Sequence, residues 1–428
     1  MRNNVGYRTS VIVSTFLPPS SLLPPPSSLP SFAMSSETRT SHLRSHIQSL
    51  LSFYTPLIID PTGGYHNQLL DDGTVYDHGT KHVVGTARFV VCYAYAARVF
   101  PEREREFIEV CEHGVKFLMG EHWDEEHGGF TWVLQKQGDG AGDGAGGGTA
   151  FVVEDGNKWG CVALATDNYR LALLCLHART IALNPTSSKR TEALLFTLQP
   201  FLFTRVWPLL FAHSILSLHF ARRYSVAFSL LALSSASLSG VQNLEPSLSR
   251  VHDLLKTFQD GDTGAFIDSF DRPLKTPSTY RGQNSNMHMC EGLIASYEAT
   301  GNREHLAAAA RVAKLLTLTL AGGCGWVIEH YDEQWVADPD KNRDVDAASE
   351  EYVFRPPGYQ PGHSMEWAKL LVLLDRHTAS TGTGNATGEG ELQCISSKLA
   401  AQNHRLKTTG KDHLETTGLE QQVQNVRS

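Results

Sequence analysis

The chain lacks the short motifs that most readily identify an enzyme. Its seven cysteines form no CxxC pair, and the sequence contains neither HExxH nor a GKS or GKT after its glycine-rich tract. These absences argue against a zinc site, a metalloprotease and a phosphate-binding loop. Unpaired cysteines are instead typical of buried thiols in a reducing compartment.

Excess basic charge and long apolar runs are also missing. The formal net charge is −8, which argues against a nucleic-acid partner. Within residues 159–225, the longest uncharged run, 206–221, has 16 residues and includes a proline, short of the roughly 20 that a membrane helix needs. Because 41% of residues are hydrophobic and 19% charged, we expect a globular protein with no membrane partner.

Both ends of the chain differ in composition from the middle. Residues 1–34 are rich in Pro and Ser, with two Arg and no acidic residue. This composition fits an organelle transit peptide, and it equally fits upstream sequence before a start at Met34. The protein is therefore expected in the cytoplasm, or in a plastid or mitochondrion if 1–34 is a targeting peptide. Residues 376–428 are polar, lack aromatics and are predicted to be disordered.

Between residues 35 and 375, helices with apolar residues at 3–4 spacing alternate with short glycine turns. Four such turns, marked by Gly64, Gly129, Gly264 and Gly325, follow at intervals of 65, 135 and 61 residues. A period of 60–70 residues with two helices per unit indicates helix pairs laid side by side. We therefore predict an all-α repeat domain over 35–375.

The middle interval is about twice the length of the others. Within it, residues 159–225 are rich in Leu, Phe and Ser, hold two acidic residues and have no glycine turn of the repeat type. Removing these 67 residues would leave an interval of 68, which matches its neighbours. We predict an insertion at 159–225, such as a retained intron, with a membrane hairpin as the functional alternative.

Two polar clusters on predicted helices are candidates for a site. Arg88 interrupts an apolar face, and a buried arginine needs a partner: either a salt bridge between helices or an anion that it clamps. Asn284, Asn286, His288 and Glu291 stand at the start of another helix, where spacing of three puts the histidine and the glutamate on one face. The pattern favours a polar pocket, with Asn284 and Glu291 as substrate-binding candidates, over a helix cap or a core histidine.

The third cluster is a histidine at a helix N-terminus. His363 follows a proline-rich lead-in, and Glu366 comes three residues later, where its carboxylate can orient the imidazole. Such a histidine suits transfer of a carbon-bound proton, and the alternative is a capping histidine with a capping-box glutamate. Glu329 and Asp332 form a competing pair of carboxylates, which would suit glycoside hydrolysis.

These segments resemble the N-acylglucosamine 2-epimerase family, and most closely its aldose–ketose isomerase branch. HVVGTARF resembles the family's arginine motif, NSNMHMCEGL its NxNMHxxEA motif and GYQPGHSMEWAKLL its PGHxxEWAxLL motif. The likeness covers roughly 40–158 and 226–375. It implies an (α/α)6 toroid that binds a monosaccharide and uses no metal or organic cofactor, and it leaves a homodimer open.

The resemblance also implies roles for these residues. Arg88 would stabilise enediolate oxygens, His288 with Asn284 would hold sugar hydroxyls, and His363, oriented by Glu366, would move the proton at C2. A proton returned to C1 gives the ketose, and one returned to the other face of C2 gives the epimer.

The chain departs from the family pattern in three places. Nothing after Leu374 matches the family's second catalytic histidine, Val226 stands where a histidine leads the fourth helix, and about four of six helix pairs are visible. We therefore expect an incomplete ring with little or no activity in the chain as given. The leading hypothesis is an isomerase of the mannose–fructose type. The alternatives are a sugar 2-epimerase, an (α/α)6 glycoside hydrolase and a degenerate sugar-binding protein without catalysis.

Overall fold

A computed structural model describes residues 36–136, 151–153, 220–322, 327–346, 352 and 355–380. Three predicted regions lie outside this set: the extension 1–34, nearly all of the insertion 159–225, and the tail beyond residue 380. The marker Gly325 also lies outside it.

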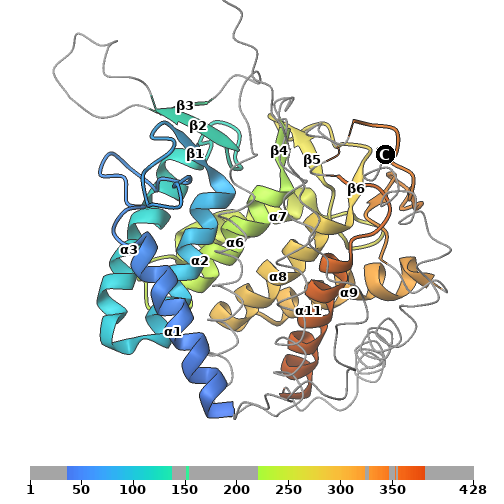
Figure 1. Ribbon diagram of the computed structural model, residues 1–428. Helices are drawn as coiled ribbons and strands as arrows, with labels where there is room; N and C mark the ends of the chain where they lie inside the picture. The colour runs from blue at the N-terminus through green and yellow to red at the C-terminus, as the bar shows by residue number, and fades with distance from the viewer. Residues whose placement is uncertain are drawn as a thin grey trace, which may run out of the picture.

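The described chain is mostly helical, as predicted (Figure 1). Its main helices are α1 (Ser36–Tyr54), α2 (Val83–Val99), α3 (Glu104–Phe117), α6 (Arg223–Leu238), α7 (Glu245–Phe258), α8 (Gln283–Thr300), α9 (Arg303–Lys314) and α11 (Pro361–Ser380). The last of these continues past Leu374, where the sequence pattern of the repeat ends.

The helices form an inner and an outer layer. The inner helices follow one another, since α2 packs against α6, α6 against α8, and α8 against α11. The outer helices cover the seams: α3 contacts α2 and α6, and α9 contacts α8 and α11. The sequences explain this division. Nearly every residue of α2 is buried, whereas α3 and α9 each bury one apolar stripe and expose charged residues on the other side.

Short strands lie along one edge of the helical layer, the upper edge in Figure 1. Strands β1 (Thr80–His82), β2 (Val133–Lys136) and β3 (Phe151–Val153) form one antiparallel sheet, β4 (Phe220–Arg222) pairs with β5 (Ser269–Asp271), and β6 (Arg281–Gly282) pairs with β7 (His330–Tyr331). Strands β1, β4 and β6 lead directly into α2, α6 and α8. The N-termini of three inner helices are therefore gathered at this edge.

The predicted glycine turns recur with the same local structure. Asp60 accepts a hydrogen bond from the backbone N–H of Thr62 at 2.9 Å, and Asp260 accepts one from Asp262 at 3.1 Å. Gly64 and Gly264, four residues further on, have φ of +67° and +70°, a conformation that favours glycine. These turns confirm the repeat at two of the three described markers, 200 residues apart.

Within the described ranges, no single helix is long and apolar enough to cross a membrane. One bent pair, Val83–Val99 with Pro101–His122, meets the criteria of length and composition together, with a bend of 115°. The run 206–221, considered above as a membrane hairpin, lies almost wholly outside these ranges.

Candidate functional site

Three inner helices bring corresponding residues into contact. Arg88, Phe228 and His288 each lie six residues beyond the strand that leads into their helix. The guanidinium carbon of Arg88 is 4.8 Å from the ring centroid of Phe228, and that centroid is 4.7 Å from the imidazole of His288. A cation, an aromatic ring and a histidine thus lie side by side across α2, α6 and α8. The repeat therefore places Phe228, which no motif marks, between the predicted site residues Arg88 and His288.

Tyr224 joins this group and was missed from the sequence. Its ring meets that of His288 edge to face, with centroids 5.2 Å apart. Burial raises the pKa of Tyr224, the charge and hydrogen bond of Arg88 lower it, and the charges of Glu366 and Glu291 raise it further. Groups from four inner helices therefore converge on one phenol. Counting from the strand before α6 could have found this residue, since Tyr224 and Asn284 stand at matching positions.

The two asparagines of the second cluster differ in role. Asn286 is fully buried, accepts from the N–H of Phe266 at 3.0 Å and donates to the carbonyl of Gly282 at 2.9 Å, so it fastens the turn to α8. Asn284 is half-buried, and its Oδ1 is enclosed with no hydrogen-bond partner in the described chain. Of the two asparagines, Asn284 is therefore the one whose side-chain oxygen is left for a ligand.

His288 and Glu291 share a helix face, as the spacing predicts. His288 Nδ1 lies 3.5 Å from Glu291 Oε2, a pairing too long for a hydrogen bond. Glu291 Oε1 accepts a hydrogen bond from Lys369 Nζ at 2.8 Å, which ties α8 to α11. Part of the Glu291 carboxylate is thus used between helices, and its role in binding substrate stays a prediction.

His363 is held by a residue other than the expected one. Its Nδ1 lies 2.9 Å and 3.0 Å from the two carboxylate oxygens of Glu329, whereas Glu366, expected to orient the ring, has no hydrogen bond or ion pair in the described chain. Glu329 reaches the ring from the opposite segment, beside β7.

The surroundings of His363 stabilise the charge that the ring gains when it accepts a proton. Burial lowers its pKa, but the hydrogen bond and charge of Glu329, together with the charge of Glu366, outweigh burial and raise the pKa above the usual value. The side chain is 22% exposed, so the ring is mostly enclosed but still partly accessible. With Nδ1 occupied, Nε2 is the nitrogen available to a substrate.

Glu329 and Asp332, considered together for glycoside hydrolysis, make separate contacts. Glu329 is buried against His363, at 3% exposure. Asp332 is exposed, and its Oδ1 accepts from the backbone N–H groups of Gln334 and Val336 in a turn. The two carboxylates therefore serve separate structures, which removes the observation on which the hydrolase alternative rested.

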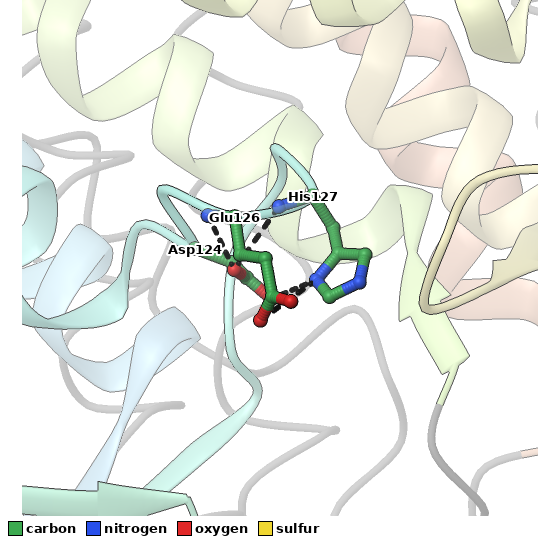
Figure 2. Close-up of side chains that lie close together, drawn as sticks. All are labelled: Asp124, Glu126 and His127. Atoms are coloured by element: carbon green, nitrogen blue, oxygen red, sulfur yellow. Dashed lines mark hydrogen bonds and ion pairs between the residues drawn. The ribbon is translucent and has the colours of Figure 1, made fainter.

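A third group of titratable residues lies in the turn after α3. Asp124, Glu126 and His127 place ligand atoms within 4.8 Å of one another (Figure 2). Asp124 Oδ1, however, accepts from the backbone N–H groups of Glu126 and His127, and Oδ2 accepts from the guanidinium of Arg272 at 2.9 Å. A cation would have to compete with that guanidinium, so we interpret the group as a turn of the repeat.

Comparison with known proteins agrees with this arrangement. The family model described as N-acylglucosamine 2-epimerase matches residues 63–153 and 217–388. A D-mannose isomerase from Marinomonas mediterranea is 30% identical over 339 residues, covering 78% of this chain and 65% of that relative. A second D-mannose isomerase, from Thermobifida fusca, is 35% identical over 154 residues, covering 36% of this chain and 37% of that relative. The chain thus spans less than two thirds of the length of these relatives.

Solved structures show the same fold. A crystal structure of a D-mannose isomerase matches with a TM-score of 0.59 at 28% identity, over 87% of this chain and 71% of that one. A cellobiose 2-epimerase from Spirochaeta thermophila matches with a TM-score of 0.56 at 14% identity, over the same shares, which supports the fold alone. The layered helices, with the polar cluster at their N-termini, have the helical-toroid fold of these sugar isomerases and epimerases. The chain belongs to the N-acylglucosamine 2-epimerase family.

Proposed function

We propose that the protein is an aldose–ketose isomerase acting on a free monosaccharide of the mannose–fructose type. The observation that carries the proposal is the state of His363, whose Nδ1 is held by Glu329 while the partly accessible ring leaves Nε2 for a substrate. The D-mannose isomerases among the relatives support mannose as the first sugar to test.

The proposed reaction needs one base and one cation. His363 Nε2 takes the proton from C2 of the open-chain aldose, the C–H electron pair forms the C1–C2 double bond, and the carbonyl pair moves to O1. Arg88 stabilises the resulting enediolate through its charge. Transfer of the O2 proton to O1, and return of the carbon-bound proton from Nε2 to C1, gives the ketose. No atom is gained or lost.

Two enclosed polar atoms support sugar binding in this pocket. Asn284 Oδ1 and His288 Nδ1 have no hydrogen-bond partner in the described chain. An enclosed polar atom left unpaired costs about 1–3 kcal/mol, so a hydroxyl that reaches it binds with a corresponding gain. A sugar offers several such hydroxyls on adjacent carbons. We therefore assign Asn284 and His288 to hydroxyl binding beside the reacting carbons.

Proton NMR of D-mannose in D₂O tests the proposal even when turnover is slow. The wild-type chain should replace the C2 proton by deuterium and produce fructose. His363→Gln should slow both processes by about 10²-fold or more, because general acid–base catalysis contributes on this scale. His377→Gln is the matched control, because it makes the same change on α11 at a histidine that pairs with Glu298 instead.

Other results would point elsewhere. Deuterated glucose without fructose would identify a 2-epimerase. Unchanged exchange in folded His363→Gln would exclude this histidine as the base. No exchange from any aldose tested with folded wild-type protein would remove the isomerase proposal and favour a sugar-binding protein.

A further inference from the structure

We propose that Glu329, held in place by Gln283 and Trp367, is the positioning residue that orients His363 and keeps a proton on its Nδ1. The inference rests on the proposed function in that His363 is the base. It assigns to Glu329 the orienting role that the spacing of the PGHxxEW motif suggests for Glu366, and it leaves Glu366 free to face the substrate.

The orientation of Gln283 can be deduced from its neighbours. Trp367 Nε1–H is only a donor, and it lies 2.8 Å from Gln283 Oε1, so that amide atom must be the oxygen. The amide nitrogen therefore faces Glu329, at 3.1 Å and 3.0 Å from its two oxygens. Gln283 and Trp367 are both fully buried, so water cannot replace either contact.

The proton on His363 follows from the same set of contacts. Gln283 Nε2 also lies 2.9 Å from His363 Nδ1, and an amide nitrogen cannot accept a hydrogen bond. Glu329 is the acceptor that both groups share, so His363 Nδ1 donates to the carboxylate. The backbone N–H of Gln360 makes a further hydrogen bond to Glu329 Oε1 at 3.2 Å. Three donors thus converge on one carboxylate, and the free lone pair of His363 is on Nε2.

The backbone around Glu329 makes this arrangement rigid. The strand pairing of β6 with β7 continues into a hydrogen bond from Gln283 N to Glu329 O at 3.0 Å. Glu329 N donates to the carbonyl of Gly358 in the lead-in to α11, also at 3.0 Å. Glu329 is therefore fastened both to the start of α8 and to the segment that delivers His363. A side chain anchored from two sides is well suited to hold a catalytic ring within the narrow limits that proton transfer needs.

The experiment combines NMR titration of His363 with kinetics on the full chain. His363→Gln identifies the His363 resonance by its disappearance. In Glu329→Gln the pKa of His363 should fall, because a hydrogen-bonded negative charge is lost while the charge of Glu366 remains. The acidic limb of the pH–rate profile should move to lower pH with it. We expect kcat to fall by about 10²-fold with KM changed only a few-fold, because orientation matters mainly in the transition state.

Two further variants make the test decisive. Glu333→Gln removes an exposed carboxylate from the same hairpin and should leave the His363 titration and kcat unchanged. Glu329→Asp keeps the charge but moves it back by one methylene, so the pKa of His363 should lie between those of the wild type and Glu329→Gln. If Glu329→Gln does not fold, as judged by circular dichroism, Glu329→Asp against wild type carries the test.

The titration separates this inference from the proposed function, since it needs no turnover. A His363 pKa that stays at the wild-type value in folded Glu329 variants would overturn the inference, even if the chain isomerises mannose. A larger downward shift in Glu366→Gln than in Glu329→Gln would also overturn it, because the glutamate of the motif would then dominate. A lowered His363 pKa in a chain without isomerase activity would support the positioning role and contradict only the proposed function.

Discussion

Arg88 illustrates how neighbours decide what a single charged residue does. From the sequence it could equally form a salt bridge between helices or clamp an anion. In the structure its guanidinium stacks on Phe228, and its charge and hydrogen bond lower the pKa of Tyr224. Aromatic residues of α6 therefore contact it on one side. A guanidinium that stacks on a ring through its face directs its N–H groups outward from its edge.

Replacement of Arg88 by lysine should therefore impair catalysis although the charge is kept. An ammonium group has neither the plane that stacks on Phe228 nor the forked donors, so we expect kcat to fall by about 10²-fold, as for loss of an oxyanion donor. KM should change much less. Steady-state kinetics with Arg98→Lys, on the same helix, provides the control. Equal kcat values for Arg88→Lys and the wild type would exclude the oxyanion role.

At the scale of elements, α7, α8 and α9 meet through two histidines and a serine. His252 Nε2 and His305 Nδ1 lie 2.9 Å and 3.0 Å from Ser296 Oγ, and the two rings are 4.3 Å apart. One hydroxyl proton can serve only one of two neutral rings, so the other ring must donate its own N–H. Burial and the charge of His305 lower the pKa of His252 to about 4, against a smaller opposing effect of Asp253. Burial therefore favours the neutral form of His252 in the folded protein.

The stability of the fold should consequently decrease in mild acid. An unfolded histidine titrates near pH 6.5, so between about pH 6.5 and 4 the unfolded chain binds more protons than the folded one. The contribution of His252 is present above pH 6.5 and is lost as pH falls, by roughly 2 kcal/mol at most. Urea unfolding at pH 7 and pH 5 should show a smaller pH dependence for His252→Gln than for the wild type. His42→Gln, at an exposed position on α1, should behave like the wild type. An unchanged pH dependence in His252→Gln would contradict this assignment.

At the scale of the whole molecule, the inner layer is continuous without the predicted insertion. Helix α6 packs directly between α2 and α8, although residues 154–222 separate it from β3 in the chain. The family model matches the chain on both sides of 154–216. Residues 159–216 are thus set apart both by their composition and by the family match.

We expect that a chain without residues 159–216 still folds. The contacts of α6 with α2 and α8 should be retained, so the melting temperature should stay within a few degrees of the full chain. Circular dichroism and size-exclusion chromatography check this expectation. Deletion of residues 245–258, which removes α7 from its contact with α6, serves as a destabilising control. Loss of cooperative melting in the 159–216 deletion would show that the segment belongs to the fold.

Local patterns in the sequence determined the class of fold and most of the candidate site. Apolar spacing predicted the helices, the glycine turns revealed the repeat, and the motifs marked Arg88, His288 and His363, because each of these signals lies within a few consecutive residues. The partner of His363 could not be predicted in this way. Glu329 is 34 residues away from it and Trp367 is 84 away from Gln283, as the hydrogen bonds show. Their contacts exist only because the pairing of β6 with β7 and the packing of α11 on α8 bring separate turns of the repeat together. Residue types and spacings are encoded locally, whereas the choice between Glu366 and Glu329 depends on directions in space that only the tertiary structure decides.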